Sequence, residues 1–312
     1  MRPCLTRRRF ITICAAAALP RQALAAAPVT RWRGAALGAE ASMTLVGIRV
    51  DAADEIFAAT QAEIDRLEGI FSLYRAGSTL ARLNLEGRLD TPPAELVELL
   101  ALSDSLHRVT GGAFDPTIQP LWQLHALAAQ EERQPKADEI AEARRRTGWI
   151  HLRHSPDAVG FRRDGMALTL NGIAQGYIAD RVAALVRARG LTDVLIDMGE
   201  IAALGRRPDR TPWRAAIATP DGEIVGEVPL GDRAMATSAP LGTQLDKAGR
   251  VGHILDPRTG RVEARWRLVS VAADSAALAD GLSTAFCLMP RHEIETVLQA
   301  HPNVSLEAIL DL

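Results

Sequence analysis

Hydrophobic positions along this chain recur first with a helical period and then in short, strand-like runs. The helical spacing predicts a long first helix that begins near Asp51 or Asp54 as its cap. Its apolar face comprises Ile56, Phe57, Ile64, Leu67 and Phe71. Further helices are predicted from Pro93 to the glycine pair at 111–112, and over 135–148, 176–190, 275–288 and 291–300.

Short apolar and β-branched runs predict the strands. They cover residues 42–50, 194–196, 213–218, 223–230, 234–237, 268–272 and 304–310. The alternating run at 166–170 predicts one more strand, with a hairpin around 163–165 before it. Because strands and helices follow one another in an irregular order, we predict an α+β fold with mixed sheets and flanking helices.

The N-terminus is typical of an export signal. Arg7 and Arg8 form a twin-arginine pattern, an apolar stretch follows, and residues 23–25 form an A-x-A cleavage signal. We therefore expect a signal peptide over 1–25, a single domain over 26–312, and export to the periplasm through the twin-arginine pathway. The apolar stretch is too short to span a bilayer and no second candidate follows, so no membrane span is expected in the mature chain.

Composition excludes two classes of site. With 36 Lys and Arg against 38 Asp and Glu, and only 4% aromatic residues, the chain offers no basic or stacking surface for nucleic acid. Removal of the signal leaves Cys287 alone, which excludes a disulfide framework and a cysteine-based metal cluster.

Two glycines, Gly172 and Gly176, mark the point where the 166–170 run gives way to a helix. Glycine there suits an anion held at a helix start, but taken alone the pattern favours a helix packed tightly on a strand. The spacing is neither that of a dinucleotide fingerprint nor that of a P-loop.

The predicted helix over 275–288 places Asp280 and Thr284 four residues apart, with Ser283 beside them. Their oxygens then share one helix face and suit a magnesium ion, although a solvated polar face has the same pattern. His253 precedes a turn-forming segment, Asp256 to Gly260. It is a candidate general base or a structural histidine.

These pieces together resemble the ApbE family, and the resemblance covers nearly the whole mature chain. Its segments are FSLYRAGSTLARLN (71–84), TGGAFDPTIQPLW (110–122), NGIAQGYIADR (171–181), DMGEIAALG (197–205), PWRAAIATP (212–220), TS (237–238), HILDPRTG (253–260) and ADGLSTAF (279–286). The family consists of FAD:protein FMN transferases that depend on magnesium and are often exported. The resemblance therefore implies an ApbE or T-fold-like domain.

Site residues follow from the resemblance position by position. Asp280, Thr284 and the carbonyl of Gly172 are implied as magnesium ligands. Ser283 stands where some relatives have a further acid and is assigned to the same metal site, and His253 is implied as the base. The positions implied to line the FAD site are Leu37, Tyr74, Ala113, Phe114, Asp115, Thr169, Gln175 and Leu255. The implied partner is an acceptor flavoprotein of a periplasmic or membrane redox complex.

Some positions depart from the family pattern. Gln175 replaces a common lysine, Thr169 a usual aspartate, and Leu37 the methionine of a Met-Gly-Thr pattern, while Met198-Gly199-Glu200 replaces Gly-Gly-Asp. Two alternatives stay open: an enzyme that hydrolyses FAD to FMN and AMP, and a non-catalytic flavin-binding or assembly protein.

Overall fold

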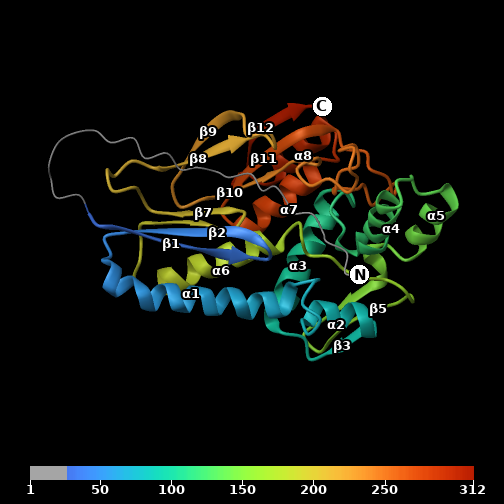
Figure 1. Cartoon of the computed structure of the whole chain (residues 1–312), viewed down its shortest axis with the longest axis horizontal. Coiled ribbons are helices and arrows are strands. Elements are labelled where there is room, and N and C mark those ends of the chain that lie inside the picture. The colour runs from blue at the N-terminus through green and yellow to red at the C-terminus, as the bar shows by residue number, and fades with distance from the viewer. Residues whose placement is uncertain (1–26) are drawn as a thin grey trace.

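The computed structural model describes residues 27–312, so the predicted signal peptide lies outside the described residues. A seven-stranded sheet forms the centre, in the order β1-β2-β6-β7-β10-β11-β12, and every neighbouring pair is antiparallel (Figure 1). Its strands are β1 (Val29–Ala36), β2 (Ala39–Val46), β6 (Val194–Asp197), β7 (Ile201–Leu204), β10 (Ala234–Ser238), β11 (Trp266–Ala273) and β12 (Ser305–Asp311).

The remaining elements surround this sheet (Figure 1). The helices are α1 (Val50–Phe71), α2 (Thr79–Glu86), α3 (Ala94–Val109), α4 (Gln119–Gln130), α5 (Ala137–Arg145), α6 (Ala174–Ala188), α7 (Ala276–Phe286) and α8 (Arg291–Ala300). Two smaller sheets are β3 (Arg88–Asp90), β5 (Ala158–Phe161) and β4 (Leu152–His154), and the hairpin of β8 (Trp213–Ala218) and β9 (Ile224–Leu230). The α+β prediction is confirmed.

Alternating side chains divide the sheet between two cores. On β2, Met43 and Leu45 face a large core shared with α1, α6 and α7, while Val46 packs on the opposite face against the β8–β9 hairpin. Trp213 and Leu230 from that hairpin fill the second core. The sheet is therefore covered by helices on one face and by a hairpin on the other.

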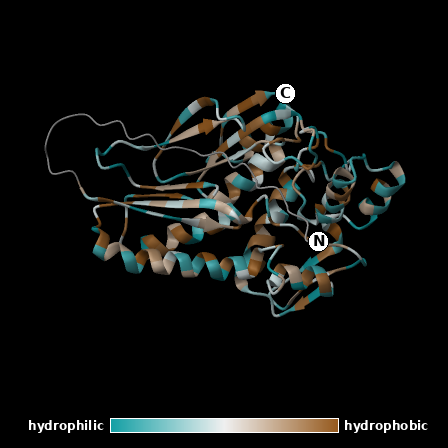
Figure 2. Cartoon of the chain, viewed as in Figure 1, coloured by the Kyte–Doolittle hydropathy of each residue, from teal (hydrophilic) through white to brown (hydrophobic). Residues whose placement is uncertain are grey.

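Helix α1 follows the spacing that predicted it. Ile56, Ile64, Leu67 and Phe71 are buried, and hydrophobic and hydrophilic segments alternate along the helix (Figure 2). The predicted aspartate cap is wrong, because the helix begins at Val50 and Asp51 lies inside its first turn. An acidic residue there still stabilises the exposed amides of the helix start.

The predicted strand at 166–170 is also wrong, although Met166, Leu168 and Leu170 are buried as its alternation implied. A side chain takes the place of a partner strand: the Asn84 amide donates to the Leu168 carbonyl at 2.8 Å and accepts from its N–H at 2.7 Å. The alternation reflects the burial of every second side chain. No strand in the described part of the chain pairs with this segment, so it does not form the backbone hydrogen bonds of a sheet.

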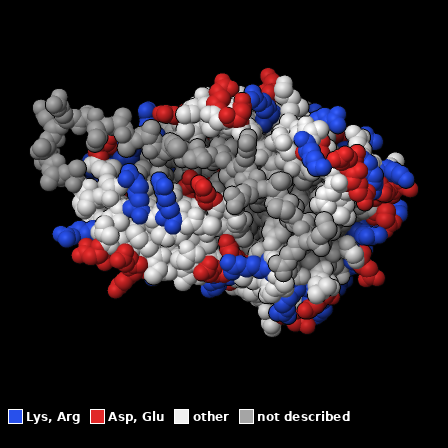
Figure 3. All heavy atoms as spheres, viewed as in Figure 1, with Lys and Arg blue, Asp and Glu red and all other residues white. Residues whose placement is uncertain are grey.

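Other differences are local. The hairpin lies at the β4–β5 connection, residues 155–157, rather than at 163–165, and the strand predicted over 42–50 ends at Val46. Helices α2 and α4 and strands β1 and β7 were not predicted. Within residues 27–312 no helix is long and apolar enough to cross a membrane. Basic and acidic side chains are interspersed on the face shown in Figure 3.

Candidate active site

A cavity of about 820 Å³ opens where the ends of β6, β7 and β10 meet the start of α6 and one face of α7. Its volume is within the range of ligand pockets, roughly 300–1,000 Å³. The sequence-predicted residues in its wall are Leu37, Tyr74, Ala113, Phe114, Asp115, Thr169, Gly172, Gln175, His253, Leu255, Asp280 and Thr284. Residues separated by up to about 250 positions are thus brought together, and Ser283 alone of the predicted set is absent from the wall.

Helices α6 and α7 interlock at this cavity. The Asp280 carboxylate on α7 accepts a hydrogen bond from the Gly176 N–H on α6, at 3.1 Å. In return, Asp180 on α6 accepts from the N–H groups of Ala276 and Ala277 at the start of α7, at 2.7 and 2.9 Å. Each helix therefore satisfies amide groups that the other leaves unpaired.

Gly176 permits this contact because it lacks a side chain. A Cβ there would lie 2.3 Å from the Ala276 carbonyl oxygen, far inside van der Waals distance. The close-packing explanation for this glycine is confirmed. Gly172 is different: a Cβ there would come 3.1 Å from Thr284 Oγ1, so its backbone lies against that hydroxyl at the cavity wall.

Hydroxyl groups support the same wall of α7. Ser283 Oγ donates to the Asp280 carbonyl at 3.0 Å and shares a 2.8 Å hydrogen bond with Ser238 Oγ at the end of β10. Ser238 also lies 3.4 Å from Thr284 Oγ1. Because Ser283 is fully buried behind the wall, the structure favours a supporting role over the ligand role that the resemblance implied.

Three carboxylates converge on the cavity. Burial raises the pKa of Asp197 to about 6, with a smaller contribution from the charge of Glu40. Burial, and then the charges of Asp280 and Asp197, raise the pKa of Glu200, and burial is also the main cause of the raised pKa of Asp280. None of the three has an ion pair with Lys or Arg among the described residues.

Clustered acids without a basic partner cost free energy unless a cation compensates them. Hard oxygen donors from Asp280, Thr284 and the Gly172 backbone at one wall have the chemistry that Mg²⁺ requires. Within residues 27–312, no group of three or more His, Cys, Asp or Glu side chains is arranged as a complete metal site. The residues therefore fit an ion that completes its shell with backbone, hydroxyl, water or substrate oxygens.

The turn at 110–117 is held from inside. Asp115 Oδ1 accepts from the N–H and the hydroxyl of Thr117, at 2.8 and 2.6 Å, and its Oδ2 accepts from the Trp149 N–H at 3.1 Å. Burial raises the pKa of this carboxyl. Its oxygens are thus engaged by the protein, so Asp115 shapes the turn that presents Ala113 and Phe114 to the cavity.

This turn is joined directly to the glycine segment. The Thr169 N–H donates to the Pro116 carbonyl at 2.8 Å, and Thr169 Oγ1 accepts from the Asn171 N–H at 3.3 Å. Further along, the Gln175 amide donates to the Met198 carbonyl at 3.3 Å and lies against Gly199. The residue that replaces a family lysine therefore bridges α6 and the β6–β7 turn.

At the opposite rim, Leu37 and Gly38 form the turn of the β1–β2 hairpin with φ of 48° and 82°. Two successive positive φ values are those of a type I′ turn. The Leu37 N–H donates to Glu68 Oε1 at 2.6 Å, which ties the hairpin to α1. Tyr74, just beyond α1, is 65% exposed at the cavity.

His253 lies on the wall with Nδ1 turned toward the protein, 3.1 Å from the Pro240 carbonyl and 3.2 Å from that of Thr243. Carbonyl oxygens only accept, so these contacts assign a proton to Nδ1, and in the neutral form of the ring the lone pair is then on Nε2. That tautomer is the one a general base at Nε2 requires.

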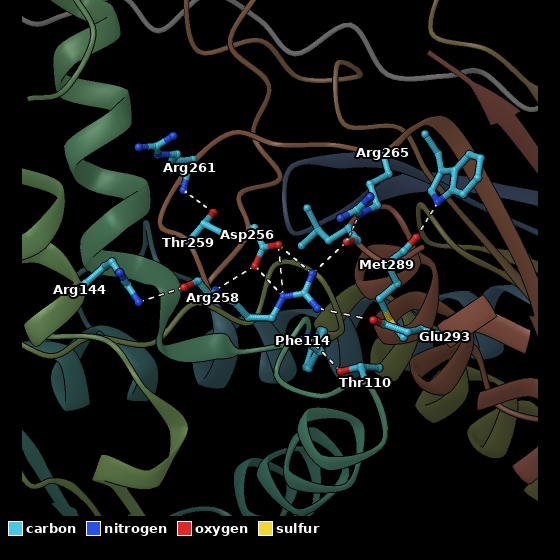
Figure 4. Close-up of polar contacts among 12 residues, drawn as sticks. Thr110, Phe114, Arg144, Asp256, Arg258, Thr259, Arg261, Arg265, Met289 and Glu293 are labelled. Atoms are coloured by element: carbon cyan, nitrogen blue, oxygen red, sulfur yellow. Dashed lines mark hydrogen bonds and ion pairs between the residues drawn. The ribbon is translucent and has the colours of Figure 1, made fainter. Parts of the chain in front are cut away.

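The segment after His253 is fixed by Arg258, which pairs closely with Asp256 and more distantly, at 3.9 Å, with Glu293 (Figure 4). Arg258 binds the buried Asp256 carboxylate through Nε and Nη2, at 2.9 and 2.8 Å, and donates to the Leu288 carbonyl at 2.9 Å. Arg144 on α5 donates to the Arg258 carbonyl at 3.0 Å. This arrangement holds Leu255 on the cavity wall and leaves Asp256 occupied by its partner.

Sequence reasoning missed Asp197, Glu200 and Ser238 as site residues. The only signals were an acid at the end of a buried strand, an unusual Met-Gly-Glu turn and a Thr-Ser pair. Their contribution depends on the pairing of β6 with β7 and of β7 with β10, which brings the three strand ends together.

Comparison with known proteins gives a consistent result. The model of the ApbE family matches residues 37–310. A FAD:protein FMN transferase of Vibrio cholerae is 31% identical over 255 residues, covering 77% of this chain and 76% of that protein. One from Klebsiella pneumoniae is 26% identical and covers 85% and 80%.

Solved structures agree. The apo flavinyl transferase ApbE of Pseudomonas stutzeri superposes with a TM-score of 0.79 at 28% identity, over 93% of this chain and 96% of that one. The flavin transferase ApbE of Vibrio cholerae also gives a TM-score of 0.79, at 26% identity, over 90% and 93%.

Proposed function

This chain belongs to the ApbE family, and we propose that it is a FAD:protein FMN transferase that moves FMN from FAD to a Ser or Thr hydroxyl of an acceptor protein and releases AMP. The observation that carries the proposal is one cavity with Asp280 and Thr284 on one wall and the Nε2-basic tautomer of His253 on another. A passive flavin carrier has no need of either feature.

Magnesium fits the first wall. Asp280, Thr284 and the Gly172 carbonyl would hold the ion, whose charge would compensate both the clustered acids and the diphosphate of FAD. Asp280 keeps one carboxylate oxygen on the Gly176 N–H, which fixes the orientation of the group. Thr284 is fixed by its contact with Ser238 and by the Gly172 backbone.

The transfer itself is a phosphoryl-group displacement. The acceptor hydroxyl oxygen forms a bond to the FMN phosphorus, the bond from that phosphorus to the bridging oxygen breaks, and AMP leaves with the electron pair. The hydroxyl proton passes to His253 Nε2. The protein supplies position and electrostatic compensation, and the walls described above are fixed before substrate enters.

Location and partner are also proposals. The twin-arginine pattern at 7–8 and the cleavage signal at 23–25 support export to the periplasm, and they lie outside the described residues. An exported transferase would act on an exported or membrane flavoprotein of a redox complex.

The test is incubation with FAD, magnesium and a candidate acceptor domain, followed by intact-mass analysis and AMP measurement. An FMN-sized adduct with equimolar AMP is expected. AMP with free FMN and no adduct would identify a FAD hydrolase, and FAD binding with no product would identify a non-catalytic protein.

Asp280→Asn tests the metal. It keeps an oxygen for the Gly176 N–H but removes the charge, so it should abolish magnesium-dependent transfer and the magnesium-induced rise in melting temperature. Asp164→Asn, at an exposed position, is the matched control and should behave as the parent. Transfer at the parental rate by Asp280→Asn would exclude Asp280 as a ligand.

A further inference from the structure

The cavity continues into a groove that contains none of the predicted FAD or metal residues. Its walls are the hairpin-facing side of β1, β2 and β6, and strand β8. The residues that line it are Arg31, Arg33, Ser42, Thr44, Leu195 and Arg214. It therefore offers space beside the proposed reaction site for something other than the nucleotide.

Strand register orders the floor of this groove. Arg31 lies opposite Thr44 and Arg33 opposite Ser42, and Ser42 in turn lies opposite Asp197 on β6. Glu40 and Asp197 make the side of the groove toward the metal wall acidic. The arginines follow along β1, at about 13 and 20 Å of strand from Leu37 at about 3.3 Å per residue. Arg31 and Arg33 therefore lie away from the Leu37 rim, where the nucleotide is predicted to bind.

The cavity borders β1 on both of its faces. Four successive residues, 31 to 34, line it, as do residues 39–42 of β2. Neighbouring side chains on a strand point to opposite faces, so the cavity reaches both sides of the β1–β2 hairpin. β1 is the terminal strand of the sheet, and no strand in the described part of the chain pairs with its outer edge. Such an edge can accept an extended peptide as an added strand.

The charge of this edge is uncompensated. Arg31 and Arg33 are exposed, and neither makes an ion pair or side-chain hydrogen bond within residues 27–312. Arg214 across the groove is paired with Glu227 at 3.3 Å. The two arginines share one face at about 7 Å spacing, which matches the side chains of residues i and i+2 on an added strand.

We propose that an extended, acidic segment of the acceptor protein adds to the edge of β1, with alternating carboxylates paired to Arg31 and Arg33. This inference rests on the proposed transferase function and names the partner surface of the same site. The added strand would run alongside β1 toward its Leu37 end and bring a Ser or Thr hydroxyl to the cavity.

Two short fluorescein-labelled peptides test it with the full chain. Each contains one threonine; in the acidic probe Asp-Val-Asp flanks it on both sides, and in the neutral probe Asn-Val-Asn does. Binding is measured by fluorescence anisotropy with FAD and magnesium present, and FMN transfer by mass. The variant is the double substitution Arg31→Gln and Arg33→Gln. Its control is Arg187→Gln with Arg189→Gln, an exposed pair at the end of α6 that removes the same charge.

The parent and the control should bind the acidic probe more tightly than the neutral one, and less so at high salt. The double variant should lose about five-fold or more in affinity for the acidic probe, as expected for two exposed charge pairs, with FAD affinity unchanged. Hydrogen exchange of the amides of 29–36 should slow when the acidic probe binds.

Equal binding of the acidic probe by parent and variant, or slowed exchange elsewhere but not in β1, would overturn the groove assignment. Weaker FAD binding by the double variant would assign the arginines to the nucleotide instead. A failure of the transferase proposal would be distinguishable from a failure of the groove assignment. In that case the parent would transfer FMN to neither probe, while fluorescence anisotropy and hydrogen exchange would still show whether the acidic probe binds at β1.

Discussion

The Asp280 carboxylate on α7 accepts a hydrogen bond from the Gly176 N–H at the start of α6, 104 residues earlier in the chain. This contact joins the glycine segment to the proposed magnesium wall, since the same approach of the helices places Gly172 against Thr284. Close helix packing and the proposed magnesium wall thus both depend on one glycine-rich segment.

Gly176→Ala should disrupt both the packing of α6 against α7 and the proposed magnesium wall. Its Cβ would lie 2.3 Å from the Ala276 carbonyl oxygen, so the helices must separate, at a cost of about 3 kcal/mol of unfolding free energy. The unfolding free energy, measured by urea denaturation, and the rate of magnesium-dependent transfer should decline together. Gly69→Ala is the control: nothing lies within 4 Å of a Cβ on that helical glycine, so stability should stay the same or rise.

His253→Gln should still bind FAD and magnesium but transfer FMN about 10²–10⁴-fold more slowly, because a general base contributes that range. The measurement is single-turnover transfer with saturating FAD, beside FAD affinity and melting temperature. His292→Gln, an exposed histidine on α8, should match the parent. A normal rate in His253→Gln would show that another group takes the proton; Asp256 is unsuited because Arg258 occupies its carboxylate.

Arg258→Met should destabilise the protein by about 2–3 kcal/mol, since it leaves the buried Asp256 carboxylate without its charged partner. FAD affinity should also fall as Leu255 loses its fixed position. Thermal unfolding measures the loss of stability, and FAD titration measures the loss of FAD affinity. Arg261→Met, which removes an exposed arginine from the same segment, should change neither; if both variants lose the same stability, the ion pair does not hold the loop.

Asp197→Asn should alter the pH dependence of stability. The folded-state pKa of Asp197 is about 6, above the ordinary value of about 3.9 for an unfolded chain. Between these values the unfolded chain releases a proton that the folded protein retains, so the parent loses stability as pH rises from about 4 to 6.

The Asp197→Asn variant has no carboxyl at this position, so its unfolding free energy should not fall with the ionisation of Asp197. Its unfolding free energy relative to the parent, measured by urea denaturation in EDTA, should increase by up to about 2 kcal/mol between pH 4 and pH 7. Asparagine can still accept from the Gly199 N–H, which controls for the hydrogen bond. A difference that does not vary with pH would mean that Asp197 ionises as an ordinary carboxyl.

Local sequence determined much of the secondary structure. The helical period of Ile56, Ile64 and Leu67 specifies α1, and Gly190 ends α6 where expected, because amphipathic spacing and helix-breaking residues act over a few positions. Strand β1 escaped prediction since its Arg31 and Arg33 face the groove rather than a core, and its register depends on β2.

For the candidate site too, the sequence identified some features and only the tertiary structure decided others. Spacing alone placed Asp280 and Thr284 on one helix face, the turn after His253 marked that residue, and the family resemblance identified the FAD-site positions. All of the predicted site residues except Ser283 line the cavity. Only the tertiary structure decided that Ser283 lies behind the wall and that Asp115 and Asp256 are engaged by internal partners. It also decided that Asp197 and Glu200 join Asp280, because charge and hydrogen-bond partners across distant strands are set by packing and leave no local pattern in the chain.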